Sequence, residues 1–239
     1  MRTPGAGPAV SVGDFIKQDL EEIMSTMIRE EVIAAIEREK VIVIVRGVEK
    51  EKLVPLAEAM YEGGIRLLEI TYSATGSPSD EEIAGNIAML AEHFAGRMYI
   101  GAGTVLKPSQ AELTARAGGS FIISPDTGRA VIERTRELGL VSIPGALTPT
   151  EIQTAHRYGA DFVKLFPANV MGIDYIKAVT APLSHIRLLA VGGVTAENKA
   201  EYLKAGACGF CIGSSIIDKK MIAKGDFAGI TELTKKFLK

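Results

Sequence analysis

The chain has 239 residues, of which 47% are hydrophobic and 23% charged, and its formal net charge is −2. This length fits one large barrel or two small domains, and the composition is that of a globular protein with an ample core. The near balance of basic and acidic residues argues against nucleic-acid and anionic-membrane partners, and no apolar run is long enough to span a bilayer. The N-terminus lacks a secretory signal, so the two cysteines predict a reducing, cytoplasmic location.

The first forty residues differ in character from the rest. Residues 1–13 are rich in glycine and proline and predict a disordered leader. Residues 14–38 predict a helix, because apolar residues recur with helical period from Ile16 to Ile36. This helix either plugs the bottom of a barrel or forms an oligomer contact. Residues 14–239 are expected to form a single domain that includes it.

The remainder of the chain repeats one design four times. One kind of run is β-rich and apolar and follows a glycine suited to the end of a helix; the second kind, which ends in glycine, precedes it in each repeat. The first kind of run occurs in EGGIRLLEIT (62–71), AGGSFIISP (117–125), YGADFVKLFP (158–167) and AGACGFCIGS (205–214). The second kind is VIVIVRG (41–47), MYIGAGT (98–104), VSIPGALT (141–148) and RLLAVGGVT (187–195).

Helix-start signals separate these runs. Capping boxes open at Ser79 and Thr148, proline follows Lys107, and Thr195 begins a further start signal. Eight strands that alternate with helices at this length predict a closed (β/α)8 TIM barrel, preceded by the additional N-terminal helix. The alternative is a doubly wound open sheet, which is weaker because Gly47 stands alone where a GxGxxG motif would be needed.

Two ionisable residues occur late in buried strands. Side chains alternate along a strand, so Lys164 shares a face with Phe162 and Phe166, and Glu69 shares one with Leu67. If both faces point inward, the two groups meet near the C-terminal mouth of the barrel, where such barrels place their active sites. A buried salt bridge or an outward-reaching lysine is the structural alternative. The functional reading is that an amine withdrawn from water attacks carbonyls while the carboxyl moves protons.

Other strand ends offer binding groups. Arg46 can hold a carboxylate through two parallel hydrogen bonds, and the hydroxyl of Thr104 either orients a bound oxygen or caps the next helix. Pro144 mainly shapes its loop, and together with Phe166 it completes the predicted substrate-binding set. Glycine-rich ends of the last two strands predict a phosphate cradle of backbone amides. Its residues are Gly192, Gly193, Gly213, Ser214 and Ser215.

The cysteines and histidines suggest no metal centre. Cys208 and Cys211 are spaced for redox or metal chemistry, but a structural zinc site needs four ligands and no second pair exists. Two small buried residues at the start of a strand are the simpler interpretation. The three histidines are scattered and show no ligand spacing.

The motifs LLEIT, GAGTVL, IPGALTPTE, VKLFPA, AVGGVT and IGSS, in this order, resemble the 2-keto-3-deoxy-6-phosphogluconate (KDPG) and 4-hydroxy-2-oxoglutarate (KHG) aldolase family. The resemblance runs from about residue 27 to the C-terminus. It implies a cofactor-free class I aldolase, usually a homotrimer, acting on a phosphorylated keto acid. It matches Lys164 to the Schiff-base lysine and Glu69 to the general acid/base. It matches Arg46 and Thr104 to the substrate-binding positions and the five cradle residues to the phosphate site.

Two positions depart from the phosphogluconate pattern of this family. Ser73 stands where that branch carries arginine, and Val191 stands where it carries threonine; features around Val191 look closer to the 6-phosphogalactonate branch. Three other functions remain open. They are the same chemistry on unphosphorylated 4-hydroxy-2-oxoglutarate, a phosphate-binding barrel isomerase or synthase without covalent chemistry, and a trimeric barrel that serves as an assembly subunit.

Overall fold

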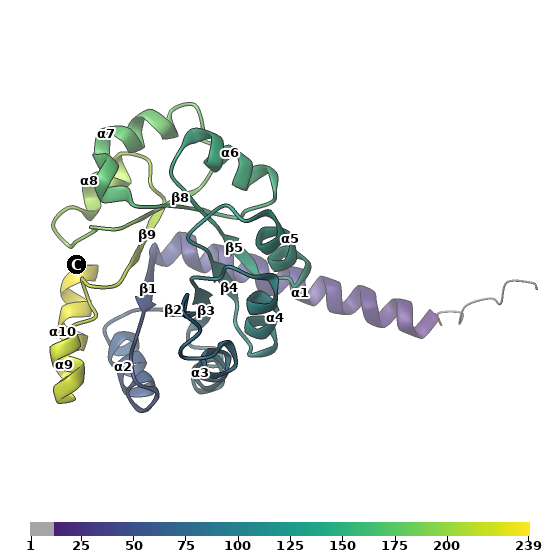
Figure 1. The fold of residues 1–239 in the computed structure, drawn as a ribbon, viewed down its shortest axis with the longest axis horizontal. Coiled ribbons are helices and arrows are strands. Elements are labelled where there is room, and N and C mark those ends of the chain that lie inside the picture. Colours follow the sequence, from purple (N-terminus) through teal and green to yellow (C-terminus); the bar gives the residue numbers. More distant parts are fainter. Residues whose placement is uncertain (1–11) are drawn as a thin grey trace, which may run out of the picture.

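The protein folds into a barrel of parallel strands surrounded by helices (Figure 1). The structure is a computed structural model that describes residues 12–239, with side chains from residue 26 onward. The strands are β1 (Val41–Val45), β2 (Leu67–Thr71), β3 (Tyr99–Gly103), β4 (Phe121–Ile123), β5 (Val141–Ile143), β6 (Gly145–Ala146), β7 (Val163–Leu165), β8 (Leu188–Val191) and β9 (Gly209–Ile212). The helices are α1 (Val12–Glu39), α2 (Lys50–Glu62), α3 (Asp80–His93), α4 (Pro108–Arg116), α5 (Arg129–Glu137), α6 (Pro149–Arg157), α7 (Ala168–Thr180), α8 (Lys199–Lys204), α9 (Lys219–Lys224) and α10 (Phe227–Leu238).

The strand order β5-β4-β3-β2-β1-β9-β8-β7-β6 closes on itself at Pro144. β5 and β6 are two pieces of the predicted fifth strand, one on each side of this proline. β5 pairs with β4, and β6 pairs with β7. The carbonyl of Pro144 accepts the Lys164 N–H at 2.8 Å, which continues the ladder across the break. The predicted (β/α)8 barrel is therefore confirmed, and the open-sheet alternative is wrong.

The first and last strands are neighbours in this barrel. β1 pairs with β2 on one side and with β9 on the other, where Val41 lies opposite Phe210. Outside this pair of strands, α10 packs on α2, and the Thr231 hydroxyl donates to the carbonyl of Ala59 at 2.9 Å.

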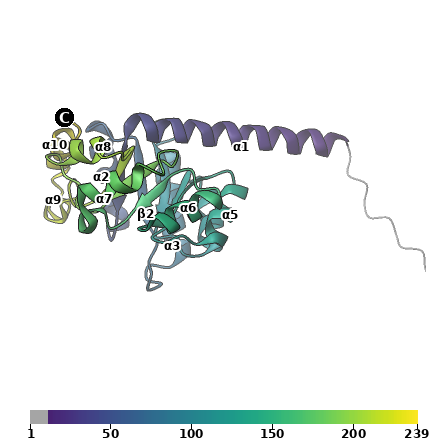
Figure 2. The ribbon, with the colours of Figure 1, turned by 90° about the horizontal axis from the view of Figure 1, so that it is seen from above.

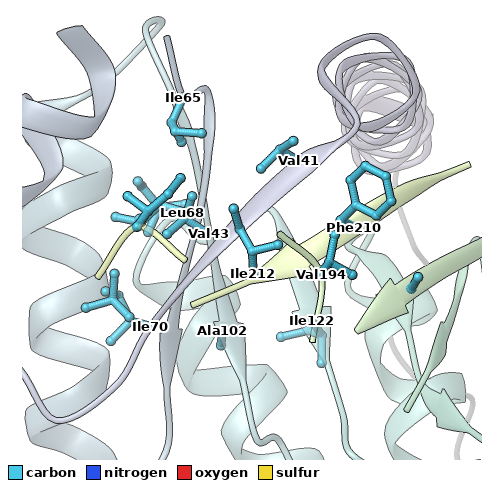
Figure 3. Close-up of a cluster of buried hydrophobic side chains, with 14 of the residues drawn as sticks. Val41, Val43, Ile65, Leu68, Ile70, Ala102, Ile122, Val194, Phe210 and Ile212 are labelled. Atoms are coloured by element: carbon cyan, nitrogen blue, oxygen red, sulfur yellow. The ribbon is translucent and has the colours of Figure 1, made fainter. Parts of the chain in front are cut away.

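Alternating strand residues separate two apolar cores. Val43, Leu68 and Ile212 belong to the outer core between the strands and the helices, which is shown in Figure 3. Ile42 and Leu67, their chain neighbours on β1 and β2, belong to a second core inside the barrel. This alternation follows from the strand period of two and matches the predicted faces.

The last turns of α1 plug the bottom of the barrel. Val32, Ile33 and Ile36 are buried and pack into the inner core. Farther from the barrel, Met27 and Ile28 are 61% and 52% exposed, and this end of the helix projects well beyond the barrel (Figure 2). The predicted plug is thus confirmed for the C-terminal part of the helix. Residues 1–11 of the predicted leader lie outside the described residues, and the helix begins at Val12, two residues earlier than predicted.

Two ion pairs fasten this plug to the barrel. The Arg29 guanidinium bonds the buried carboxylate of Asp161, which also accepts the Ser142 N–H at 2.9 Å. Arg187 bonds Glu37 at 2.8 Å near the surface. Asp161 lies two residues before the strand that carries Lys164, so the plug contacts the segment that leads into that strand.

Helix caps follow the predicted signals with one difference. Ser79 and Thr148 form capping boxes for α3 and α6, and Pro108 opens α4. The start predicted at Thr195 is wrong, because α8 begins at Lys199. The side chain of Asn198 turns back to accept the Thr195 N–H, and this keeps the intervening residues out of the helix. Within residues 12–239, the structure has no helix that is both long and apolar enough to cross a membrane.

Candidate active site

Lys164 lies in the middle of β7 and points into the barrel mouth. Its side chain is largely buried, with a relative exposure of 8% for the residue, and Nζ lies 4.9 Å from the ring centroid of Phe166. Phe162, two residues earlier and therefore on the same face, is fully buried in the inner core. Both predicted neighbours therefore share the lysine's face. The aliphatic stem is surrounded by apolar groups, and the amine reaches the solvent-facing cavity.

Glu69 lies in the middle of β2 and is 1% exposed. Its Oε2 has no hydrogen-bond partner. Burial raises the pKa of Glu69 to about 7, although the positive charges of Lys164 and then Arg46 act to lower it. No direct ion pair joins Glu69 to Lys164 among the described residues, so the salt-bridge alternative is not what the structure contains. A carboxyl with a pKa near neutrality suits proton transfer.

Arg46 and Thr104 meet at the ends of β1 and β3. The Arg46 guanidinium donates to the Thr104 hydroxyl at 3.0 Å. Thr104 has a positive φ of 56°, an unfavourable conformation for a β-branched residue. Such local strain is found where the surrounding structure requires a particular side-chain direction. The pair presents a planar cation and a hydroxyl to the same space.

A cavity of about 540 Å³ opens at this end of the barrel. Nine of the eleven predicted site residues line it, while Glu69 and Pro144 do not. Pro144 is buried and meets Lys164 through its carbonyl. The nine lining residues are Arg46, Thr104, Lys164, Phe166, Gly192, Gly193, Gly213, Ser214 and Ser215.

The glycine loops after β8 and β9 form one wall of the cavity. Gly192 and Gly193 have φ values of 105° and 72°, and a Cβ on Gly193 would lie 2.5 Å from the Cβ of Asn169. Only glycine fits both requirements. Ser215 donates its hydroxyl to the Val194 carbonyl at 2.6 Å and so joins the two loops, whereas Ser214 is exposed.

The two positions that depart from the phosphogluconate pattern lie in different places. Val191 lines the main cavity. Ser73 lines a neighbouring hollow of about 290 Å³, which shares Arg46 and Thr104 with the main cavity. The Ser73 hydroxyl accepts the backbone N–H of Ser77 at 3.2 Å and thereby holds its own loop. A serine here leaves the hollow open where an arginine would fill it.

Sequence reasoning missed two ionisable residues of the cavity. Cys211 lies on β9 between the inner core and the cavity, and its buried thiol has a pKa raised above its ordinary range. Lys219, the first residue of α9, lines the opening. The alternation along β9 could have indicated Cys211, but no sequence pattern marks Lys219. Cys208 and Cys211 are free thiols, and among the described residues no cluster of three potential metal ligands occurs.

A (β/α)8 barrel with a buried lysine and a buried carboxyl at its mouth defines an enzyme that acts on carbonyl compounds. A family model described as KDPG and KHG aldolase matches residues 32–233. The chain therefore belongs to the KDPG/KHG aldolase family, and it is a lyase. Schiff-base cleavage to pyruvate and an aldehyde is typical of that family.

Similar proteins agree with this family. The chain is 34% identical over 208 residues to a 2-dehydro-3-deoxy-phosphogluconate aldolase of Treponema pallidum, covering 87% of this chain and 96% of that protein. It is 38% identical over 176 residues to a 2-dehydro-3-deoxy-6-phosphogalactonate aldolase of Escherichia coli, covering 73% and 83%. The KDPG aldolase of Legionella pneumophila, solved with pyruvate as a covalent carbinolamine, has a TM-score of 0.74 and 30% identity, with 82% and 93% covered.

Proposed function

We propose that this protein is a class I aldolase that cleaves a 2-keto-3-deoxy-6-phospho sugar acid to pyruvate and glyceraldehyde 3-phosphate. The observation that carries the proposal is the buried lysine in a cavity whose lining places Arg46 and Thr104 at one side and two glycine loops at another. Such a cavity offers a nucleophile, a carboxylate-binding pair and an anion-binding wall to one extended ligand.

The first half of the reaction builds an electron sink. The amine of Lys164 attacks the C2 ketone, and loss of water leaves a protonated imine. Arg46, with the Thr104 hydroxyl beside it, binds the substrate carboxylate next to this carbon. The glycine loops bind the phosphate at the far end, so the C3–C4 bond is held within the cavity.

The second half moves protons. Glu69, directly or through a water, removes the proton of the C4 hydroxyl, and the C3–C4 electron pair moves into the imine. Glyceraldehyde 3-phosphate leaves, and an enamine of pyruvate remains on the lysine. Protonation at C3 and hydrolysis then release pyruvate and restore the amine. A pKa of about 7 leaves the Glu69 carboxyl able both to accept and to return the proton near neutral pH.

Trapping with borohydride tests this proposal. The full chain is incubated with pyruvate and borohydride, and the adduct is mapped by mass spectrometry. One reduced pyruvate on Lys164, absent from Lys164→Met, is expected. The absence of any adduct on the folded protein would contradict the proposal and favour a phosphate-binding barrel without covalent chemistry.

Val191 supports a galactonate-type substrate over a gluconate-type one. A valine at the cavity wall gives no hydrogen bond to a C4 hydroxyl, where threonine offers one. The kcat/KM for the galactonate epimer divided by that for the gluconate epimer measures this preference. Val191→Thr should lower this ratio, because threonine offers a hydrogen bond that favours the gluconate epimer. The homotrimer and the cytoplasmic location stay predictions, and sedimentation velocity tests the first.

A further inference from the structure

The cavity carries an excess of positive charge. Three cationic residues line it, namely Arg46, Lys164 and Lys219, and its described lining contains no carboxylate. A 6-phosphorylated keto acid brings one negative charge on its carboxylate and about two on its phosphate. Arg46 accounts for the carboxylate, and the nitrogen of Lys164 becomes bonded to C2 of the substrate in the imine. This leaves Lys219 as the cation available to the phosphate.

The side chain of Lys219 is not engaged elsewhere in the described structure. Its neighbour Asp218 caps α9, and the Asp218 carboxylate accepts the N–H groups of Lys220 and Met221 at 2.7 and 3.0 Å. Among the residues whose side chains are described, the lysines that form ion pairs are Lys52, Lys177 and Lys235. Lys219 is therefore an exposed residue that lines the cavity, and the carboxylate of the preceding residue, Asp218, is occupied by backbone N–H groups.

The position of Lys219 matches the wall that binds the phosphate. It lies in the segment that follows β9, a few residues beyond Gly213 and Ser214, and it shares the cavity with Gly192 and Gly193. Backbone amides supply dipoles but no net charge, whereas an ammonium group supplies the charge itself. Lys219 is exposed, so an ion pair between its amine and a phosphate at this wall would carry no large desolvation penalty.

We infer that Lys219 binds the substrate phosphate and makes the enzyme selective for phosphorylated over unphosphorylated keto acids. This inference rests on the proposed aldolase function. Because the residue contacts a part of the substrate far from the reacting bond, it lowers KM and leaves kcat unchanged. Because it is exposed, its effect weakens as ionic strength rises.

The test compares Lys219→Met with the matched control Lys220→Met. Lys220 is the next residue, is also exposed and is not among the residues that line the cavity. In Lys219→Met we expect KM for the phosphorylated substrate to rise about tenfold at low salt, the scale of one charge-assisted hydrogen bond, with kcat retained. Inhibition by inorganic phosphate should weaken by a similar factor. Lys219→Arg should restore most of the affinity, and Lys220→Met should match the wild type.

Pyruvate trapping separates the two possible failures. Pyruvate has no phosphate, so its imine should form equally well in the wild type and in Lys219→Met. An absent imine in the wild type would overturn the proposed aldolase function. An intact imine and normal turnover, combined with equal KM and equal phosphate inhibition in the two lysine variants, would overturn the role of Lys219 alone.

Discussion

The Glu69 carboxyl fills the space that a side chain at Gly103 would need. An ideal Cβ on Gly103 would stand 1.5 Å from Glu69 Oε1 and 2.1 Å from its carboxyl carbon. The acid on β2 is thus held against the bare backbone of β3, which pairs with it residue by residue up to Thr71 opposite Gly103. Gly101 has a similar role, since its missing side chain admits the ring of Phe121. The GAG sequence of β3 therefore shapes the inside of the barrel.

Gly103→Ala should displace the Glu69 carboxyl and impair proton transfer. General acid–base catalysis contributes at least about 100-fold, so we expect kcat to fall by about that factor. Imine formation with pyruvate should survive better than turnover. The matched control is Gly85→Ala, in which a Cβ meets nothing within 4 Å. Wild-type turnover in a folded Gly103→Ala protein would contradict the assigned position of the acid.

Glu69→Gln should change how stability depends on pH. The folded-state pKa of Glu69 is raised from 4.5 to about 7, so the folded protein holds this proton more tightly than the unfolded chain. The protonated Glu69 side chain therefore stabilises the folded state below the unfolded pKa, and this stabilisation is lost as the pH rises from about 5 to 7. The loss reaches up to about 3 kcal/mol at full burial. Urea unfolding at several pH values should show that the free energy of unfolding declines with pH in the wild type and changes less in Glu69→Gln. Equal pH dependence in the two proteins would show that Glu69 does not titrate differently in the folded and unfolded states.

Thr104→Gly should separate stability from activity. Glycine accepts a φ of 56° without strain, so the free energy of unfolding should rise by up to about 1 kcal/mol, reduced by the greater freedom of glycine in the unfolded chain. The hydroxyl that receives the Arg46 hydrogen bond is lost, and KM should increase. Thr104→Val keeps the branched shape without the hydroxyl, so it should lose affinity and gain no stability. Urea unfolding measures the change in stability of each variant, and initial-rate kinetics measures the change in KM.

Arg29→Met should destabilise the barrel more than Glu37→Gln does, although each breaks one ion pair between α1 and the barrel. Asp161 is buried, and removing Arg29 leaves its charge with the Ser142 N–H and Arg136, which is 3.7 Å away. A loss of about 2 kcal/mol follows for a partly compensated buried charge. The Glu37 pair with Arg187 is exposed and contributes under about 1 kcal/mol. Equal losses in urea unfolding would show that burial does not distinguish the two pairs.

Much of this architecture could be predicted from local patterns. Glycines next to apolar runs predicted the position of every strand. Both signals, the left-handed residue that ends a helix and the apolar run, are encoded over a few residues. Strand parity then placed Lys164 on one face with Phe162 and Glu69 on one face with Leu67, but it left open whether these faces point inward; in the structure both ionisable residues are buried. The caps at Ser79 and Thr148 also follow from a four-residue signal.

Features that depend on distant residues could not be predicted in this way. Arg29 and Asp161 are 132 positions apart, and only the closed barrel brings them together. The break at Pro144 depends on what pairs on each side of it. Lys219 follows the last strand in a segment whose path is set by tertiary packing, so its place in the cavity is visible only in three dimensions.

The pairing of β1 with β9 has a consequence for synthesis on the ribosome. The hydrogen-bonding edge of Val41–Val45 stays uncovered until Gly209–Ile212 has left the exit tunnel, after all the other strands of the barrel have been made. An apolar, uncovered strand edge is an aggregation hazard for a nascent chain. Messages truncated before codon 209 should therefore yield insoluble products, and chaperone dependence should end abruptly once the last strand has emerged.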